Sequence, residues 1–124
     1  MKKLFLTMCL TVMLSTPAIA ACEGGTEYTV DGDTFCISNI TLNWWSASNW
    51  CQANGMHLAT VYEVCPDWNG TTGNTCGRTF SFDDYCWTTT ANGSEKAFDI
   101  YPSGGGVYTS SRNGDRSDHA LCAN

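Results

Sequence analysis

The sequence predicts a small α+β domain in which two short helices pack on small antiparallel sheets, with long irregular loops and disulfide staples. Three observations lead to this class. One segment has apolar residues at helical spacing, and the next has a helix-capping pattern. Several short runs are rich in β-forming residues and are bounded by turn signals. The chain also contains 8 cysteines, a density typical of small exported domains.

The N-terminal segment has the features of a secretory signal peptide. Lys2 and Lys3 precede an apolar run over residues 4–14, and Ala18-Ile19-Ala20 forms a small-x-small cleavage site. We therefore expect residues 1–20 to be removed near Ala20, leaving a single domain over residues 21–124. No later run approaches the roughly 20 apolar residues of a membrane span. The expected location is secreted or periplasmic, and the Lys-Lys start is of a bacterial type.

Charge and cysteine usage exclude several classes of function. Without Lys2 and Lys3, 6 − 2 = 4 basic residues face 12 acidic ones, so the net charge is 4 − 12 = −8. Nucleic acid is not an expected partner, because there is no basic patch to neutralise phosphates. Cys9 leaves with the signal peptide, so an odd number of cysteines remains and one should be unpaired. We expect neither zinc nor a cofactor, since no Cys-x-x-Cys pair is present and His57 and His119 are the only histidines.

The segment "NWWSASNWCQANG", residues 43–55, predicts the first helix. Asn43 is a suitable N-cap, and Gly55 is a suitable residue to end the helix. At about 100° per residue, one stripe of the helix should face the core. Trp45 lies away from this stripe and should be partly exposed. The residues on the stripe are Trp44, Ala47, Trp50 and Cys51.

The remaining elements follow from capping and turn signals. Thr60 to Glu63 has the spacing of a capping box, so a second helix should begin there and stop at Pro66. Residues 67–82, rich in glycine and asparagine, predict a long surface loop. An Asp31-Gly32 turn predicts a hairpin between residues 28–30 and 34–38. Further strands are expected at 85–90, 96–101, 104–111 and 119–123.

One run of spaced residues extends from the first predicted helix into the second: Trp44-x-x-Ala47-x-x-x-Cys51-x-x-x-Gly55-x-x-Leu58-Ala59-x-x-x-Glu63. This order resembles the first-helix signature of C-type-lectin-like domains. "YCWTTT", a following hairpin and a last strand ending in cysteine also look like compact bacterial members of this fold. The resemblance covers roughly residues 26–123. It implies that Cys51 bonds to Cys122 of the last strand.

Pairs for the other cysteines are also expected. Cys22 and Cys36 flank the first hairpin strand and should pair, as in long forms of the family. Cys65 and Cys76 bracket the glycine-rich loop, where a bond would limit its disorder. Cys86 is then the free thiol. Pairing of Cys86 with Cys65 or Cys76 stays open, because sequence does not fix connectivity.

The family's calcium-dependent sugar-binding triplets, Glu-Pro-Asn or Gln-Pro-Asp and then Trp-Asn-Asp, are absent from this sequence. Residues 113–115 and Asp118 offer oxygens, but a polar turn explains them more simply, so we expect no metal. Binding is expected through the loops instead, where aromatic, arginine and asparagine side chains give contact area at low entropy cost. Ordinary half-buried loop residues are the alternative interpretation. The candidate ligand-binding residues are Trp68, Asn69, Tyr101, Tyr108, Arg112, Asn113 and Arg116.

Together these features predict an exported binding module that recognises a protein or glycan at a cell or envelope surface without calcium. The alternative is a structural envelope or appendage component, dimerised by a disulfide bond through Cys86. We predict no enzyme and no catalytic residue. Formylglycine-generating enzymes share the fold, but this chain is too short and lacks their cysteine motif. The sequence places neither histidine near Cys86.

Overall fold

The computed structural model describes residues 22–124, so the predicted signal peptide lies outside the described residues. The described chain is an α+β domain with two helices, as predicted. Neither helix in this part of the chain is long and apolar enough to cross a membrane. The elements in order are β1 (Gly25–Val30), β2 (Asp33–Leu42), α1 (Trp44–Ala53), β3 (His57–Leu58), α2 (Val61–Val64), β4 (Gly73–Asn74), β5 (Cys86–Asn92), β6 (Lys96–Tyr101), β7 (Gly106–Ser111) and β8 (Asp118–Ala123).

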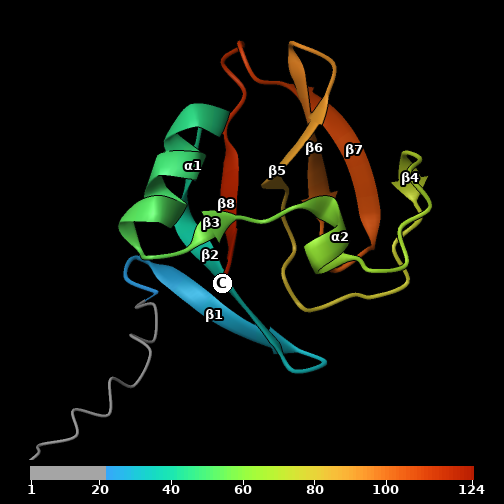
Figure 1. Cartoon of the computed structure of the whole chain (residues 1–124), viewed down its shortest axis with the longest axis horizontal. Coiled ribbons are helices and arrows are strands. Elements are labelled where there is room, and N and C mark those ends of the chain that lie inside the picture. Colours follow the sequence, from blue (N-terminus) through green and yellow to red (C-terminus); the bar gives the residue numbers. More distant parts are fainter. Residues whose placement is uncertain (1–21) are drawn as a thin grey trace, which may run out of the picture.

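The strands form one mixed sheet, which differs from the predicted small antiparallel sheets. Their order is β1-β2-β8-β5-β6-β7-β4, and β3 also pairs with β8 (Figure 1). The chain therefore ends in the middle of the sheet, where β8 lies between β2 and β5. The β5–β8 pair is parallel, through Cys86 with His119 and Trp87 with Ala120. All other pairs are antiparallel.

Local signals in the sequence act as expected at both helices and at the first turn. The side chain of Asn43 accepts a hydrogen bond from the backbone of Ser46, and α1 ends just before Gly55, whose φ is +71°. Thr60 and Glu63 form the predicted capping box at the start of α2. Residues 31 and 32 both have positive φ, as a two-residue hairpin turn requires.

Successive residues of the central strands point to opposite faces of the sheet and belong to two apolar clusters. Trp87, Ala97 and Ala120 pack with Ala47 and Cys51 of α1. Their strand neighbours Cys86, Phe98 and Leu121 pack with α2 and the loop after it. The predicted stripe of α1 is confirmed, because Ala47 and Cys51 are buried, Trp44 and Trp50 are half-buried, and Trp45 is 57% exposed.

Three disulfide bonds join the cysteine pairs that the sequence analysis expects: Cys22–Cys36, Cys51–Cys122 and Cys65–Cys76. Cys86 is the free thiol within residues 22–124, and it is fully buried. A disulfide-linked dimer through Cys86 would therefore require β5 to open. The structure gives this alternative no support.

The segment between α2 and β5 differs from the predicted surface loop. Gly73 and Asn74 form β4, which pairs with β7. Trp68 is only 8% exposed; its ring packs on Phe98, and its Nε1 donates to the carbonyl oxygen of Thr71 at 2.8 Å. The indole of Trp68 therefore offers little surface to a ligand, and its predicted role in binding stays untested. The Cys65–Cys76 bond holds this segment against the sheet, and the Trp68 indole packs in the core there.

Gly105 fixes the contact between this segment and the β6–β7 turn. Its φ is +68°, and a Cβ there would collide with the carbonyl oxygen of Cys76. Gly105→Ala should therefore lower the free energy of unfolding by clearly more than the roughly 1–2 kcal/mol that a positive φ costs an alanine. Gly93→Ala is the matched control, because its φ is +77° and the space around it is open. Urea denaturation of both variants tests this, and equal losses would contradict the collision.

Candidate functional site

Three tyrosines and an arginine gather over β6 and β7, on the same face of the sheet as α1 but beyond the strands that α1 covers. We call Tyr85, Tyr101, Tyr108 and Arg116 the tyrosine face. The ring of Tyr85 lies 5.1 Å from that of Tyr101 and 5.8 Å from that of Tyr108, between centroids, in edge-to-face arrangements. The guanidinium of Arg116 lies over the Tyr85 ring, 5.0 Å from its centroid. These contacts join side chains from β6, from β7, from the residue before β5 and from the β7–β8 loop.

Strand register explains why these side chains meet. Tyr108 of β7 is opposite Asp99 of β6, and Tyr101 is two residues beyond Asp99, so the three side chains share one face. Tyr101 is opposite Gly106, and a Cβ at Gly106 would collide with the Tyr108 ring. The missing side chain at Gly106 thus makes room for Tyr108. The Tyr108 hydroxyl lies 3.3 Å from Oδ1 of Asn74, which ties β4 to the face.

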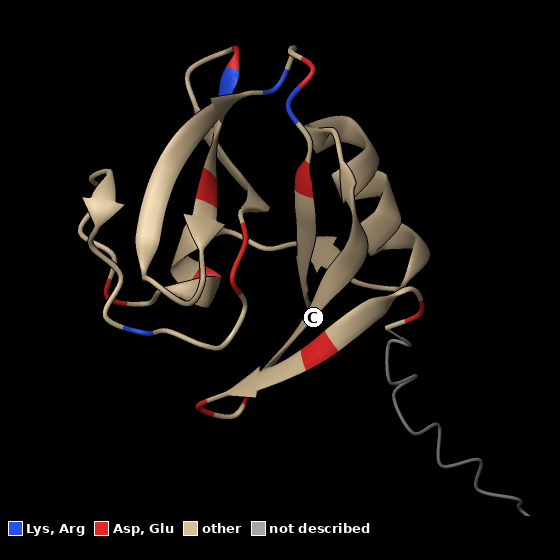
Figure 2. Cartoon of the chain, turned by 180° about the vertical axis from the view of Figure 1, so that it is seen from behind, with Lys and Arg blue, Asp and Glu red and all other residues tan. Residues whose placement is uncertain are grey.

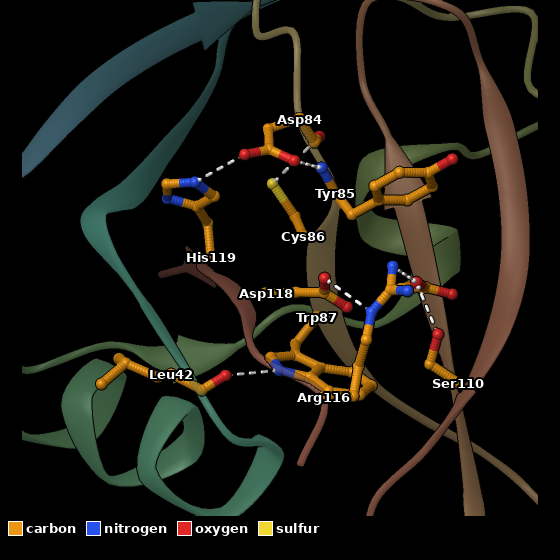
Figure 3. A network of polar contacts seen from close by, with 10 residues as sticks. Leu42, Asp84, Tyr85, Cys86, Trp87, Ser110, Arg116, Asp118 and His119 are labelled. Carbon is orange, nitrogen blue, oxygen red and sulfur yellow. Dashed lines mark hydrogen bonds and ion pairs between the residues drawn. The ribbon is translucent and has the colours of Figure 1, made fainter. Parts of the chain in front are cut away.

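Two buried aspartates lie beside Arg116. Nε of Arg116 donates to Oδ1 of Asp118 at 3.0 Å, and its Nη2 lies 3.5 Å from Oδ2 of Asp99 (Figure 3). Ser110 donates to the same Asp99 oxygen at 2.9 Å. The side chains of Asp99 and Asp118 are 1% and 4% exposed, whereas Arg116 is 43% exposed. Arg116 therefore links the buried carboxyl groups to the surface.

The charges in this cluster do not balance. Two carboxyl groups face a single guanidinium, and Oδ1 of Asp99 and Oδ2 of Asp118 are buried without a hydrogen-bond partner. Burial raises the pKa of Asp118 to about 6; Arg116 opposes this shift and the charge of Asp99 adds to it. Burial also raises the pKa of Asp99, against the opposing effects of Ser110 and Arg116.

Comparisons of the chain with protein-family models, curated proteins and solved structures found no match. The C-type-lectin-like family therefore stays a prediction. What the chain does has to be argued from its own residues.

The structure brings Cys86 and His119 together, which no pattern in the sequence indicates. They are opposite each other in the β5–β8 pair. Nε2 of His119 lies 3.1 Å from Oδ2 of Asp84, and Nδ1 lies 2.6 Å from the carbonyl oxygen of Ser38. Burial, and then the charges of Asp118, Asp84 and Asp99, raise the pKa of the Cys86 thiol well above its usual value. A buried, protonated thiol is a poor nucleophile, so this arrangement does not make a catalytic cysteine.

The other predicted ligand-binding residues have local roles. Oδ1 of Asn69 accepts hydrogen bonds from the backbone and hydroxyl of Thr71 and so closes its own turn. Arg112 lies over the Trp44 ring and donates to the carbonyl oxygens of Gly93 and Ser94. Asn113 is exposed beside it in the β7–β8 loop.

Positive charge collects at one end of the molecule. Of the four basic residues in the described chain, three lie in or beside the β5–β6 turn and the β7–β8 loop (Figure 2). These three are Lys96, Arg112 and Arg116. The remaining one, Arg78, pairs with Asp33 at the β1–β2 turn.

The tyrosine face is an open surface. Two cavities of about 430 and 320 Å³ lie elsewhere, around the β1–β2 turn and Pro66. A group of potential metal ligands in residues 22–124, Cys65, Asp67 and Cys76, is not available, because the two sulfurs are bonded to each other. An open surface with aromatic rings suits a macromolecule or a glycan better than an enclosed small molecule.

Sequence reasoning found part of the tyrosine face. Tyr101, Tyr108 and Arg116 were predicted, and each of them contacts Tyr85. Tyr85 and Asp99 were missed. The signal for Asp99 was available, because it is the one acidic residue inside "KAFDIY", and an aspartate in a buried strand needs a partner or a function.

Proposed function

We propose that the protein is an exported binding module with a C-type-lectin-like fold, and that it recognises a protein or glycan through the tyrosine face without calcium. The observation that carries this proposal is the cluster around Tyr85, whose ring contacts the rings of Tyr101 and Tyr108 and the guanidinium of Arg116 on an open surface. Tyrosine and arginine dominate the energetics of binding surfaces. A tyrosine has few rotatable bonds, so ordering it on binding costs little entropy.

Rigidity of the scaffold supports the proposal. Tyr101 and Tyr108 lie on the paired strands β6 and β7, Tyr108 is linked to Asn74, and Arg116 is held by two carboxyl groups. Preorganised contact residues reduce the entropy lost on binding. The Cys51–Cys122 bond agrees with the resemblance of residues 44–63 to the lectin-like first helix. Three disulfide bonds are consistent with an extracellular protein.

Tyr108→Ala should weaken ligand binding by at least about tenfold, because it removes the exposed ring of the tyrosine face. The test is to screen the mature protein against glycans and against envelope and host-surface proteins, with and without chelator. The best binder is then measured with the variant by calorimetry. Tyr62→Ala is the matched control, since Tyr62 is 53% exposed but lies on α2.

Two results would contradict the proposal. Equal affinity of wild type and Tyr108→Ala would remove the tyrosine face from the binding site. Binding that disappears with chelator would show that a cation takes part.

A further inference from the structure

We propose that Asp99 and Asp118 share one proton, and that this makes the attachment of Arg116 to the tyrosine face dependent on pH. The inference concerns the regulation of the proposed binding site, and its biological meaning rests on the proposed function. The geometry that carries it is a pair of buried carboxyl groups held by a single guanidinium.

The hydrogen bonds leave one oxygen of each carboxyl group without a donor. Each carboxyl group has one oxygen directed to Arg116, and each has a second, buried oxygen without a partner. The two carboxyl groups are neighbours, because Arg116 contacts Asp118 through Nε and Asp99 through Nη2. One proton between the two groups therefore gives a partner to acceptors that are otherwise unsatisfied in the core.

The surroundings supply no second positive charge. Arg116 is the only cation that contacts the pair among the described residues. From β5 the uncharged side chain of Trp87 lies opposite Asp99. The Cys86 thiol on the other face of the strand stays neutral, and the Asp84 carboxylate is engaged by His119. Ser110 of β7 is uncharged, and Tyr85 and Tyr108 present phenols. The only ionisable residue type in α1 is cysteine, at Cys51, and it is in a disulfide bond.

The direction of the pH effect follows from the raised pKa values. The pKa of Asp118 is about 6, so the folded protein takes up a proton between about pH 7 and pH 5, where an unfolded aspartate stays ionised. The folded state binds more protons there, so stability rises as pH falls through this range. Protonated Asp118 attracts Arg116 less, which leaves Asp99 as its charged partner. The guanidinium over Tyr85 should then be held less tightly.

Asp118→Asn provides a mimic of the protonated state. The amide oxygen still accepts from Arg116, and the amide nitrogen donates toward Asp99 as a protonated carboxyl would. Asp115→Asn is the matched control, because Asp115 is an exposed acid in the same loop. The experiment is an NMR titration of the three proteins from about pH 8 to about pH 4, a range that spans the pKa values of free and perturbed aspartate. It follows the carboxyl carbons, the Arg116 Nε–H and the Tyr85 ring, with thermal unfolding measured alongside.

In the wild type and in Asp115→Asn, we expect the Asp118 carbon to inflect near pH 6 and the Arg116 and Tyr85 signals to shift over the same range. In Asp118→Asn these shifts should disappear. Tm should rise between about pH 7.5 and pH 5 in the wild type. This rise should exceed the rise in Asp118→Asn by at least about 4 °C.

Two results would overturn the inference. One is a carboxyl-carbon titration of Asp118 with the ordinary pKa of an aspartate, and the other is Arg116 and Tyr85 NMR signals that do not shift with pH. If Asp118→Asn fails to fold, the wild-type carboxyl titration still decides. The measurement needs no ligand, so it is independent of the binding assay. A tyrosine face that binds nothing would leave the titration intact, whereas a flat titration would leave the proposed binding function standing.

Discussion

Replacing Trp87 with alanine is expected to lower the free energy of unfolding by about 4 kcal/mol. The Trp87 side chain is fully buried between α1 and the sheet. Its Nε1 donates to the carbonyl oxygen of Leu42 at 2.8 Å, which ties β5 to the end of β2. The variant therefore combines a large cavity with a partly buried carbonyl that has lost its donor. Both effects destabilise the same part of the core.

Trp45→Ala is the matched control for this prediction. Trp45 is 57% exposed on the outer side of α1, so removing its ring should change the free energy of unfolding by no more than about 0.5 kcal/mol. Denaturation of the oxidised proteins by urea, followed by circular dichroism, measures both values. Similar losses in the two variants would show that Trp87 does not have the packing described.

Removal of the Cys51–Cys122 bond has the second-largest expected effect. The bond joins residues 71 apart in the sequence, linking α1 to the last strand. Closing a loop of this length lowers the conformational entropy of the unfolded chain. In the chain-entropy model this raises the free energy of the unfolded state by about 4 kcal/mol. The double variant Cys51→Ala with Cys122→Ala should lose about this amount of stability. The single variant Cys51→Ser, which leaves Cys122 unpaired, should yield no secreted folded protein.

The Cys65–Cys76 bond offers the comparison. It closes a loop of 11 residues, for which the same model gives about 3 kcal/mol. Thermal unfolding of the two double variants should therefore rank Cys51–Cys122 as the more stabilising bond. Wild-type thermal stability without Cys51 and Cys122 would contradict the role assigned to their bond.

Features set by neighbouring residues were predictable from the sequence. Asn43 caps α1 through Ser46, Thr60 and Glu63 cap α2, and the Asp31-Gly32 pair turns the first hairpin. In each case the interacting groups are within four residues, so the pattern alone contains the geometry. The stripe of α1 was predictable for the same reason, because helical spacing fixes which residues share a side.

The candidate site was predicted less completely, and Trp68 shows why. Its neighbours are glycine, asparagine and aspartate, which indicate a loop, and a tryptophan in a loop suggests a contact residue. The Cys65–Cys76 bond and the β4–β7 pair bring that loop against Phe98 instead. Burial of a loop residue depends on what the loop is folded against, and no local pattern contains this information.

The sequence by itself determined the α+β class, the caps, the first turn and the side of α1 that faces the core. The tertiary structure alone decided that β8 lies between β2 and β5 and that Tyr85 meets Tyr101, Tyr108 and Arg116. It also decided that Asp99 and Asp118 are buried beside one guanidinium. The physical reason is that strand order and register join residues distant in the chain. These pairings are selected by the packing of the whole core, which no short segment of the sequence specifies.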